Sequence, residues 1–165
     1  MSVSTTGKGL MDVLKAVSEI SQIDVLVGVP HGEVRADGDG MTNAAIGYLL
    51  ETGSPAMNLP ARPHLVPAIE EVQDIIGQKL TQAVDAALEG NTRRMHFFLN
   101  AAGMKASMNV KRFINAGDFA PLAPLTIQAR KTRGRKSVKP LVDTAQYRNS
   151  HTYVVMNGNK EVNHA

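Results

Sequence analysis

The chain has 165 residues, of which 43% are hydrophobic and only 4% aromatic, and it contains no cysteine and no tryptophan. The length suits one domain with a buried core, which must be aliphatic because rings are scarce. Without cysteine, a disulfide framework, a thiolate metal site and a thiol nucleophile are excluded. We therefore predict a single domain over residues 1–165.

Neither the start of the chain nor its interior indicates contact with a membrane. The first 20 residues lack the apolar run and small-residue cleavage site of a signal peptide. No stretch approaches the ~18 consecutive apolar residues that a membrane-spanning helix needs. We expect a protein with no membrane partner.

The net charge of +3 is unevenly distributed. Six positive residues and no acidic one lie between residues 130 and 139: Arg130, Lys131, Arg133, Arg135, Lys136 and Lys139. Subtracting these six charges from the net +3 leaves −3 for the rest of the chain. A basic segment on a slightly acidic body is suited to an acidic protein partner or a phosphate backbone.

The first third of the chain predicts a helix, a strand and a second helix. Apolar residues recur every three or four positions over residues 9–20, as in an amphipathic helix. The β-branched run over residues 23–29 predicts a strand, and the polar, glycine-rich residues 31–40 predict a loop. A helix over residues 44–51, capped by Thr42 or Asn43, should end at Gly53.

The middle third predicts a rigid turn followed by a long helical hairpin. Two prolines flank an arginine in Leu59-Pro60-Ala61-Arg62-Pro63, which restricts the backbone on both sides of it. Apolar stripes then predict one helix over residues 68–89 and a second from Asn91 or Thr92 to Gly117. The very short linker at Gly90 makes the two helices antiparallel.

The last third predicts a short helix over residues 125–131, capped near Thr126, and then the basic loop. Residues 148–156 alternate in the manner of a strand, and Asn157-Gly158-Asn159 is a turn signal. We interpret the polar residues 158–165 as a flexible tail or arm. The expected fold class is α+β: a small, mostly antiparallel sheet that includes residues 23–29 and 150–156, packed by helices, with a long helical hairpin and extended loops.

No constellation of catalytic or metal-binding residues emerges from the sequence. Asp37-Gly38-Asp39-Gly40 resembles a calcium loop only at its start, because position twelve is Tyr48 where a glutamate is needed. His151, Asp143 and Ser150 lack the nucleophile elbow of a hydrolase. We expect no enzymatic activity, no cofactor and no metal, and histidines that are surface or internally satisfied residues.

Two stretches resemble a family pattern when they are taken together and in order. The first comprises Ala45–Ser54 and Leu59–Pro63. The second comprises Leu122–Ile127, Arg130-Lys131, Lys139–Thr144 and Arg148–Ser150. They are similar to the tail-completion and neck proteins of tailed bacteriophages, of the virion-morphogenesis and minor-tail-Z-like group. Where that group usually has a glycine, this chain has Ala145, and alanine disfavours a positive φ.

The resemblance implies a structural protein of the virion neck, assembled in the cytoplasm of a bacterial host. It would complete the tail and join it to the head connector as a ring, expected to be a hexamer that matches the tail's symmetry. Its partners would be copies of itself, the tail terminator or tail tube, and the head-connector proteins, with non-specific contact to DNA in the channel. The residues expected at the interfaces are Arg62, Pro60, Pro63, Leu65, Arg130, Lys131, Arg133, Arg135, Lys136, Asp143 and Arg148.

The roles of Arg62 and of the basic segment are left open by the sequence. Arg62 either contacts a neighbouring subunit or clamps the loop to its own fold. The basic segment 130–139 is either a solvated loop, a docking site for an acidic partner or a contact to DNA phosphates; it lacks aromatic residues that stack on bases. The alternative function is therefore a DNA-binding accessory protein that uses residues 130–139.

Overall fold

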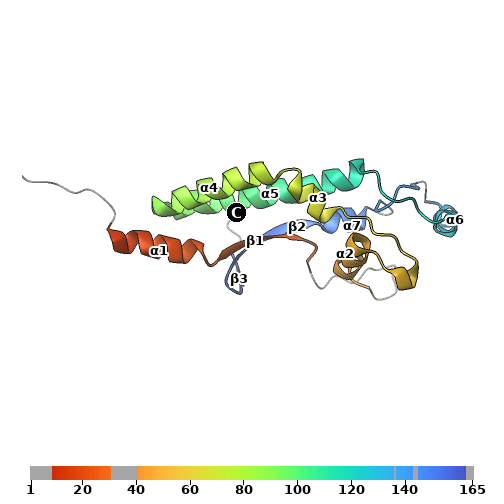
Figure 1. The fold of residues 1–165 in the computed structure, drawn as a ribbon, viewed down its shortest axis with the longest axis horizontal. Coiled ribbons are helices and arrows are strands. Elements are labelled where there is room, and N and C mark those ends of the chain that lie inside the picture. The colour runs from red at the N-terminus through yellow and green to blue at the C-terminus, as the bar shows by residue number, and fades with distance from the viewer. Residues whose placement is uncertain (1–8, 31–40, 136, 143–144, 163–165) are drawn as a thin grey trace, which may run out of the picture. The chain divides into compact units, whose positions relative to one another are not determined.

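The computed structural model describes residues 9–30, 41–135, 137–142 and 145–162, and it confirms the α+β fold class. A three-stranded antiparallel sheet in the order β1-β2-β3 accompanies the helices (Figure 1). The elements in chain order are α1 (Leu10–Ile20), β1 (Ile23–Gly28), α2 (Asn43–Thr52), the 3-10 helix η1 (Pro55–Met57), α3 (Leu65–Glu70), α4 (Gln73–Leu88), α5 (Thr92–Ala116), α6 (Pro124–Thr132), α7 (Gln146–Ser150), β2 (Thr152–Asn157) and β3 (Lys160–Glu161).

The described residues group into two compact units, each assembled from segments far apart in the sequence. Of the described residues, 9–26, 74–103 and 154–162 belong to unit 1, and 27–30, 41–73, 104–135, 137–142 and 145–153 belong to unit 2. Several elements, α5 among them, continue from one unit into the other. A single domain over residues 1–165 stays a prediction.

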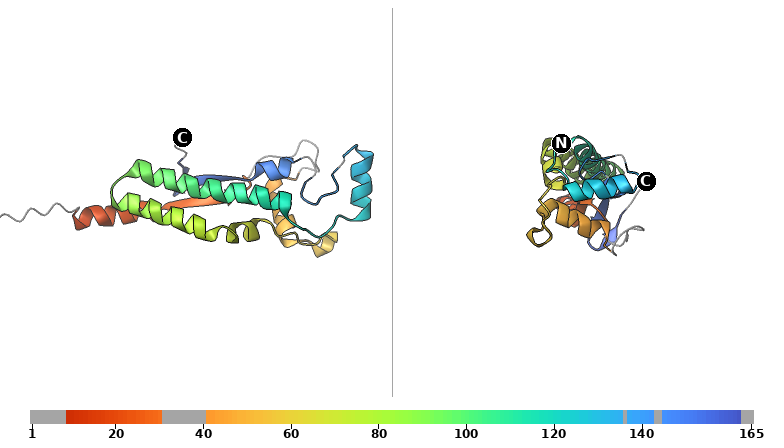
Figure 2. Two further views of the ribbon diagram at one scale, coloured as in Figure 1. Left: turned by 90° about the horizontal axis from the view of Figure 1, so that it is seen from above. Right: turned by 90° about the vertical axis from the view of Figure 1, so that its right-hand side faces the viewer.

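Unit 1 is built on the predicted helical hairpin. Helix α4 and the first half of α5 lie side by side (Figure 1, Figure 2). Their buried side chains are mostly small, which allows a close approach of the two backbones: Ala83, Ala86, Ala87, Met95, Leu99 and Ala102. The turn is a Schellman motif, in which Gly90 has a φ of 70° and Asn91 N–H donates to the Ala86 carbonyl at 2.8 Å. The side chain of Asn91 then caps α5 by accepting from Arg94 N–H.

The C-terminal part of unit 1 is a strand hairpin. Met156 pairs with Glu161 and Asn157 with Lys160, and Gly158 has a positive φ in the predicted turn. Val162 N–H also donates to the Val155 carbonyl. The structure therefore places residues 158–162 in this hairpin instead of a tail, and residues 163–165 lie outside the described residues.

Helix α2 in unit 2 has the expected cap and stop. The Thr42 hydroxyl accepts from Ala45 N–H at 3.1 Å, and Gly53 follows the helix with a φ of 76°. A Cβ at Gly53 would lie 2.7 Å from the Ala61 backbone nitrogen. Glycine is required here both by the backbone conformation and by the close approach of the Pro-Ala-Arg-Pro turn.

The single helix predicted over residues 68–89 is wrong, because the structure breaks it into α3 and α4. In a continuous helix, Val72 N–H would donate to the Ala68 carbonyl. That carbonyl instead accepts from the side-chain amide of Asn109 on α5, at 2.7 Å, and Val72 N–H turns to the Ile69 carbonyl. A tertiary hydrogen bond therefore ends the helix where propensity would continue it.

Two expectations about the last third also need correction. Residues 148–150 belong to α7, and the strand begins only at Thr152. Helix α6 begins at Pro124 after Ala123, so Thr126 lies inside its first turn and caps nothing. The loop expected over residues 31–40 lies outside the described residues.

Ala145 precedes α7 with a φ of 61°, the left-handed region that alanine disfavours. We predict that Ala145→Gly raises the free energy of unfolding by about 1 kcal/mol, since glycine adopts this conformation without the steric penalty of a Cβ. Denaturant unfolding measures the change. The matched control is Ala129→Gly on the exposed side of α6. This variant should lower the free energy of unfolding by about 1 kcal/mol. An equal decrease in the free energy of unfolding of both variants would contradict the prediction.

Candidate functional site

A cluster of buried aromatic and histidine rings lies at the centre of unit 2. His64 and His151 are each only 1% exposed, and Tyr147 is 6% exposed. The ring of His64 meets Tyr147 and His151 edge to face, with centroids 5.5 and 5.6 Å apart, and Phe119 packs against its other side. The cluster joins the rigid turn before α3 to helix α7, which is more than 80 residues later.

Polar contacts run through this cluster in a chain. The Tyr147 hydroxyl lies 2.5 Å from His64 Nε2, and His64 Nδ1 lies 2.8 Å from the Arg62 carbonyl and 3.0 Å from Glu51 Oε2. The arrangement is satisfied when the hydroxyl donates to Nε2 and Nδ1–H donates to the oxygens behind it. Burial, together with the Glu51 charge, raises the pKa of Tyr147, so its hydroxyl keeps its proton.

Glu51, at the end of α2, caps a helix to which it does not belong. Its carboxylate accepts from the backbone N–H groups of His64, Leu65 and Val66 at 2.8, 3.0 and 3.1 Å. These are the orphan donors at the start of α3, and no cap hydrogen bond comes from the side chain of His64, the residue in the cap position. Burial raises the pKa of Glu51, but the three backbone hydrogen bonds outweigh it, so the pKa is lowered overall.

Arg62 acts as an internal clamp, the second of its two expected roles. Its side chain is 4% exposed, and Nε and Nη2 donate to the carbonyls of Ala120 and Pro121 at 2.7 and 2.9 Å. Burial and the charge of Arg130 both lower its pKa. A contact of Arg62 with a neighbouring subunit stays a prediction, and it would require the guanidinium to leave these carbonyls.

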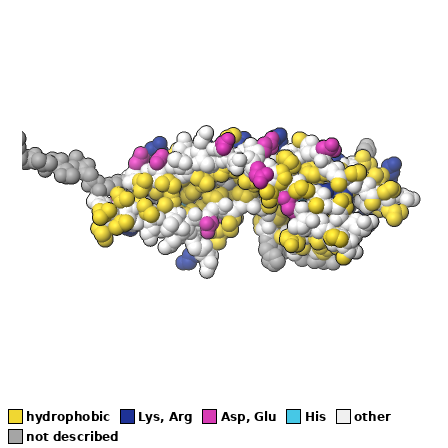
Figure 3. Space-filling view, in the orientation of Figure 1, with side chains coloured by type: hydrophobic (Ala, Val, Ile, Leu, Met, Phe, Trp, Pro, Cys, Tyr) yellow, Lys and Arg dark blue, Asp and Glu magenta, His cyan; other side chains and the backbone are white. Residues whose placement is uncertain are grey.

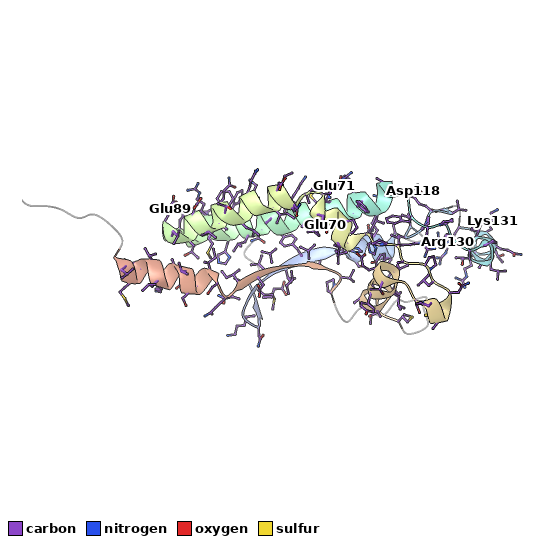
Figure 4. All side chains as sticks on the ribbon, viewed as in Figure 1. Glu70, Glu71, Glu89, Asp118, Arg130 and Lys131 are labelled. Atoms are coloured by element: carbon purple, nitrogen blue, oxygen red, sulfur yellow. The ribbon has the colours of Figure 1, made fainter. Side chains whose placement is uncertain are left out.

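The basic segment is more ordered internally than a solvated loop. Arg130 Nη1 donates to the carbonyls of Ser137, Lys139 and Val142, and Lys139 donates to the carbonyl of Asn115. Two of the cations, Lys131 and Arg133, are exposed at the end of α6, while Arg135 is half-buried. Figure 4 labels Arg130 and Lys131 on this helix. Lys136 and Asp143 lie outside the described residues.

The remaining expected interface residues lie in different environments. Pro60 and Pro63 are exposed on the turn, whereas Leu65 packs against the core of unit 2. Arg148 donates to the side-chain oxygens of Asn115 and Asn149. Three of the predicted residues, Pro60, Arg62 and Arg130, line one groove of unit 2.

An apolar groove lies in unit 2 between the α2–η1 region and α6; we call it the α2–α6 groove. It has a volume of about 590 Å³, and among the described residues that line it two are arginines and none is acidic. Leu50, Met57, Leu122 and Leu125 contribute to its walls. Leu125 is 79% and Met57 62% exposed, so these walls present apolar surface to solvent.

Unit 1 exposes a second apolar surface, on helix α1. None of its residues is buried, and four large apolar side chains, Leu10, Met11, Leu14 and Val17, are 48–76% exposed. We call these four the α1 apolar face. Figure 3 shows hydrophobic side chains gathered over this helix. Exposed apolar patches of this kind mark interaction sites.

Asn43, the first residue of α2, is 1% exposed, and both polar atoms of its side chain lack a hydrogen-bond partner. It lines a second cleft of unit 2 together with Asn149, Ser150 and Thr152. A buried, unsatisfied amide is costly, on the order of 1–3 kcal/mol.

The central cluster was missed in the sequence because its members are scattered. His64, Tyr147 and His151 lie outside the quoted stretches, although the expectation of internally satisfied histidines is confirmed for His64 and His151. Two signals were available: Glu51 lies within the stretch Ala45–Ser54, and His64 follows directly on the rigid turn. The described residues contain no group of three potential metal ligands and no helix able to cross a membrane.

Comparisons with family models, with curated proteins and with solved structures find no match to this chain. The site must therefore be interpreted from its geometry. Both nitrogens of His64 and both oxygens of Glu51 are used inside the chain, so the cluster is equipped to hold segments together.

We predict that Arg62→Lys lowers the free energy of unfolding by about 2 kcal/mol, because a single ammonium group cannot replace a planar fork on two carbonyls. Denaturant unfolding of the monomer measures the change. Arg133→Lys, at an exposed position, is the matched control and should stay within about 0.5 kcal/mol. An unchanged monomer with weakened assembly would instead assign Arg62 to an interface.

We further predict that acid weakens the protein through His151. Burial, reinforced by the nearby His64, lowers the pKa of His151 to about 4, against 6.5 for an ordinary histidine. Between pH 4 and 6.5 the imidazole of His151 binds a proton in the unfolded chain but stays neutral in the folded chain. The free energy of unfolding should therefore fall as the pH drops from 6.5 to 4, by up to about 3 kcal/mol.

Urea unfolding across this pH range measures the effect, and NMR titration of the His151 ring locates its pKa in the native protein. His151→Gln should remove the decline between pH 6.5 and 4. The pKa of Glu51 is lowered, so protonation of Glu51 reduces the free energy of unfolding only below about pH 4.5. A flat stability profile from pH 7 to 5 would refute the assignment to His151.

Proposed function

We propose that this chain is a structural protein of the neck of a tailed bacteriophage, which completes the tail and joins it to the head connector as a closed ring, most simply a hexamer. The observation that carries the proposal is the meeting of its two characteristic stretches. Arg62 from the first stretch bonds to Ala120 and Pro121 at the edge of the second, and His64 beside the first bonds to Tyr147 beside the second. The two stretches that resemble the family pattern are thus tied together within unit 2 by their own residues and by residues next to them.

The surfaces of the chain support a role in assembly. The α1 apolar face and the α2–α6 groove both leave large apolar side chains in solvent. They are different in shape and lie on different elements, as the two faces of a heterologous interface must be. Such interfaces generate closed rings when the rotation between subunits closes.

A DNA-binding accessory protein remains the second candidate, and the exposed cations Lys131 and Arg133 favour it. Arg130 and Lys139 instead donate hydrogen bonds to backbone carbonyls of their own chain. Few phosphate contacts would give weak binding with a shallow dependence on salt.

Light scattering of the purified protein at low and high salt, with and without duplex DNA, tests the two functions. We expect a discrete assembly whose mass is a multiple of 17.7 kDa, six-fold for a hexamer, unchanged by DNA. Electron microscopy should show it as a ring, either alone or after addition of tails that lack this protein. Monomers or dimers that bind DNA tightly at low salt and release it at high salt would favour the accessory protein. Monomers that join neither DNA nor tails would refute both.

A further inference from the structure

We propose that α1 of one subunit docks, through its apolar face, in the α2–α6 groove of a neighbouring copy of this chain. The inference rests on the proposed ring and names the segment that closes it. It starts from two apolar surfaces, one on each unit, which nothing in the described chain covers.

The spacing of the α1 apolar face fits a helix that docks in a groove. Leu10, Leu14 and Val17 stand at positions i, i+4 and i+7, and Met11 lies on the same stripe. This is the spacing by which amphipathic helices insert anchors into a partner's groove. An 11-residue helix is about 16 Å long, so three successive anchors span about 10 Å.

The opposite side of α1 is already in use within its own unit. Asp12, Ala16 and Glu19 line a cavity with Ala87 and Met95 of the α4–α5 hairpin, while Val13 and Ile20 are half-buried. The half-buried side of α1 is therefore apolar as well, with Val13, Ala16 and Ile20, and the α1 apolar face is additional surface left in solvent. Docking in a neighbour's groove requires no detachment of α1 from unit 1.

The groove offers a matching lining. Its walls are leucine, methionine and proline side chains over a volume of about 590 Å³, and Tyr147 of the central cluster forms part of its floor. Leu125, the most exposed large apolar residue of the described chain, stands on its α6 wall. Insertion of α1 would cover Leu125 and the α1 apolar face at once.

Charge favours a second copy as the occupant. Helix α1 carries Asp12, Lys15 and Glu19 for a net charge of −1, and its last turn has no basic residue, so its C-terminal end is negative. Helix α6 ends with Arg130 and Lys131, followed by exposed Arg133. We therefore expect α1 to lie with its C-terminal end near Lys131, an orientation selected by electrostatics more than by affinity.

Cysteine crosslinking tests the contact cleanly because the chain has no cysteine of its own. A Val17→Cys copy and a differently tagged Leu125→Cys copy are mixed and treated with a short bismaleimide. We expect a crosslinked pair that contains both tags. Met104→Cys replaces Val17→Cys in the control, since the two residues are 51% and 48% exposed, and it should give only background.

Three results would overturn the inference: crosslinking no greater than in the control, dominant Val17–Val17 pairs, or an internally closed monomer when both cysteines are on one chain. Charge-reversal variants provide an independent check. Lys131→Glu should slow crosslinking roughly threefold at low salt, and Glu19→Lys in the partner should restore it, whereas Lys160→Glu should have no effect. Slower crosslinking with Lys131→Glu that Glu19→Lys does not restore would refute the proposed orientation.

Failure of this inference can be told from failure of the proposed function. A ring of the expected mass without the Val17–Leu125 crosslink leaves the neck function standing and removes the docking site. A strong crosslink in open chains that never close and never join tails retains the docking site and removes the neck function.

Discussion

The hydrogen bonds from Arg62 to the carbonyls of Ala120 and Pro121 are the constraint on which unit 2 depends. They tie the segment that enters α3 to the segment that leaves α5, almost 60 residues later in the chain. The carbonyls lie in an irregular stretch that has no strand or helix to satisfy them, and a buried carbonyl without a donor is costly. The guanidinium supplies two donors in one rigid group, which is why lysine is a poor replacement.

The same logic extends to the neighbouring groups. Glu51 satisfies three backbone N–H groups at the start of α3, and His64 links that helix to Tyr147. The buried polar groups here are hydrogen-bonded to one another, and the network adds a specific arrangement to the apolar core that the same segments share around Ala68, Val110 and Ile114. Asn43 is the exception, because neither polar atom of its buried amide has a hydrogen-bond partner.

Unit 1 follows a different principle. Its helices approach closely through alanines, and the turn at Gly90 is a standard helix stop. Helix α1, by contrast, leaves its apolar face in solvent. Large apolar side chains that stay exposed on a folded unit, as on α1, are suited to association with further copies.

The sequence by itself determined most of the local structure: α1, β1, α2 with its Thr42 cap and Gly53 stop, the α4–α5 hairpin and the turn at Gly158. These elements depend on periodicity, capping and glycine conformation, which act over a few residues. Only the tertiary structure decided the break between α3 and α4, the helix at residues 146–150 and the buried cluster around His64. For the break and for the cluster, the deciding hydrogen bond comes from a residue distant in the chain, Asn109 for Ala68 and Tyr147 for His64, and such partners leave no periodic signal in a single sequence.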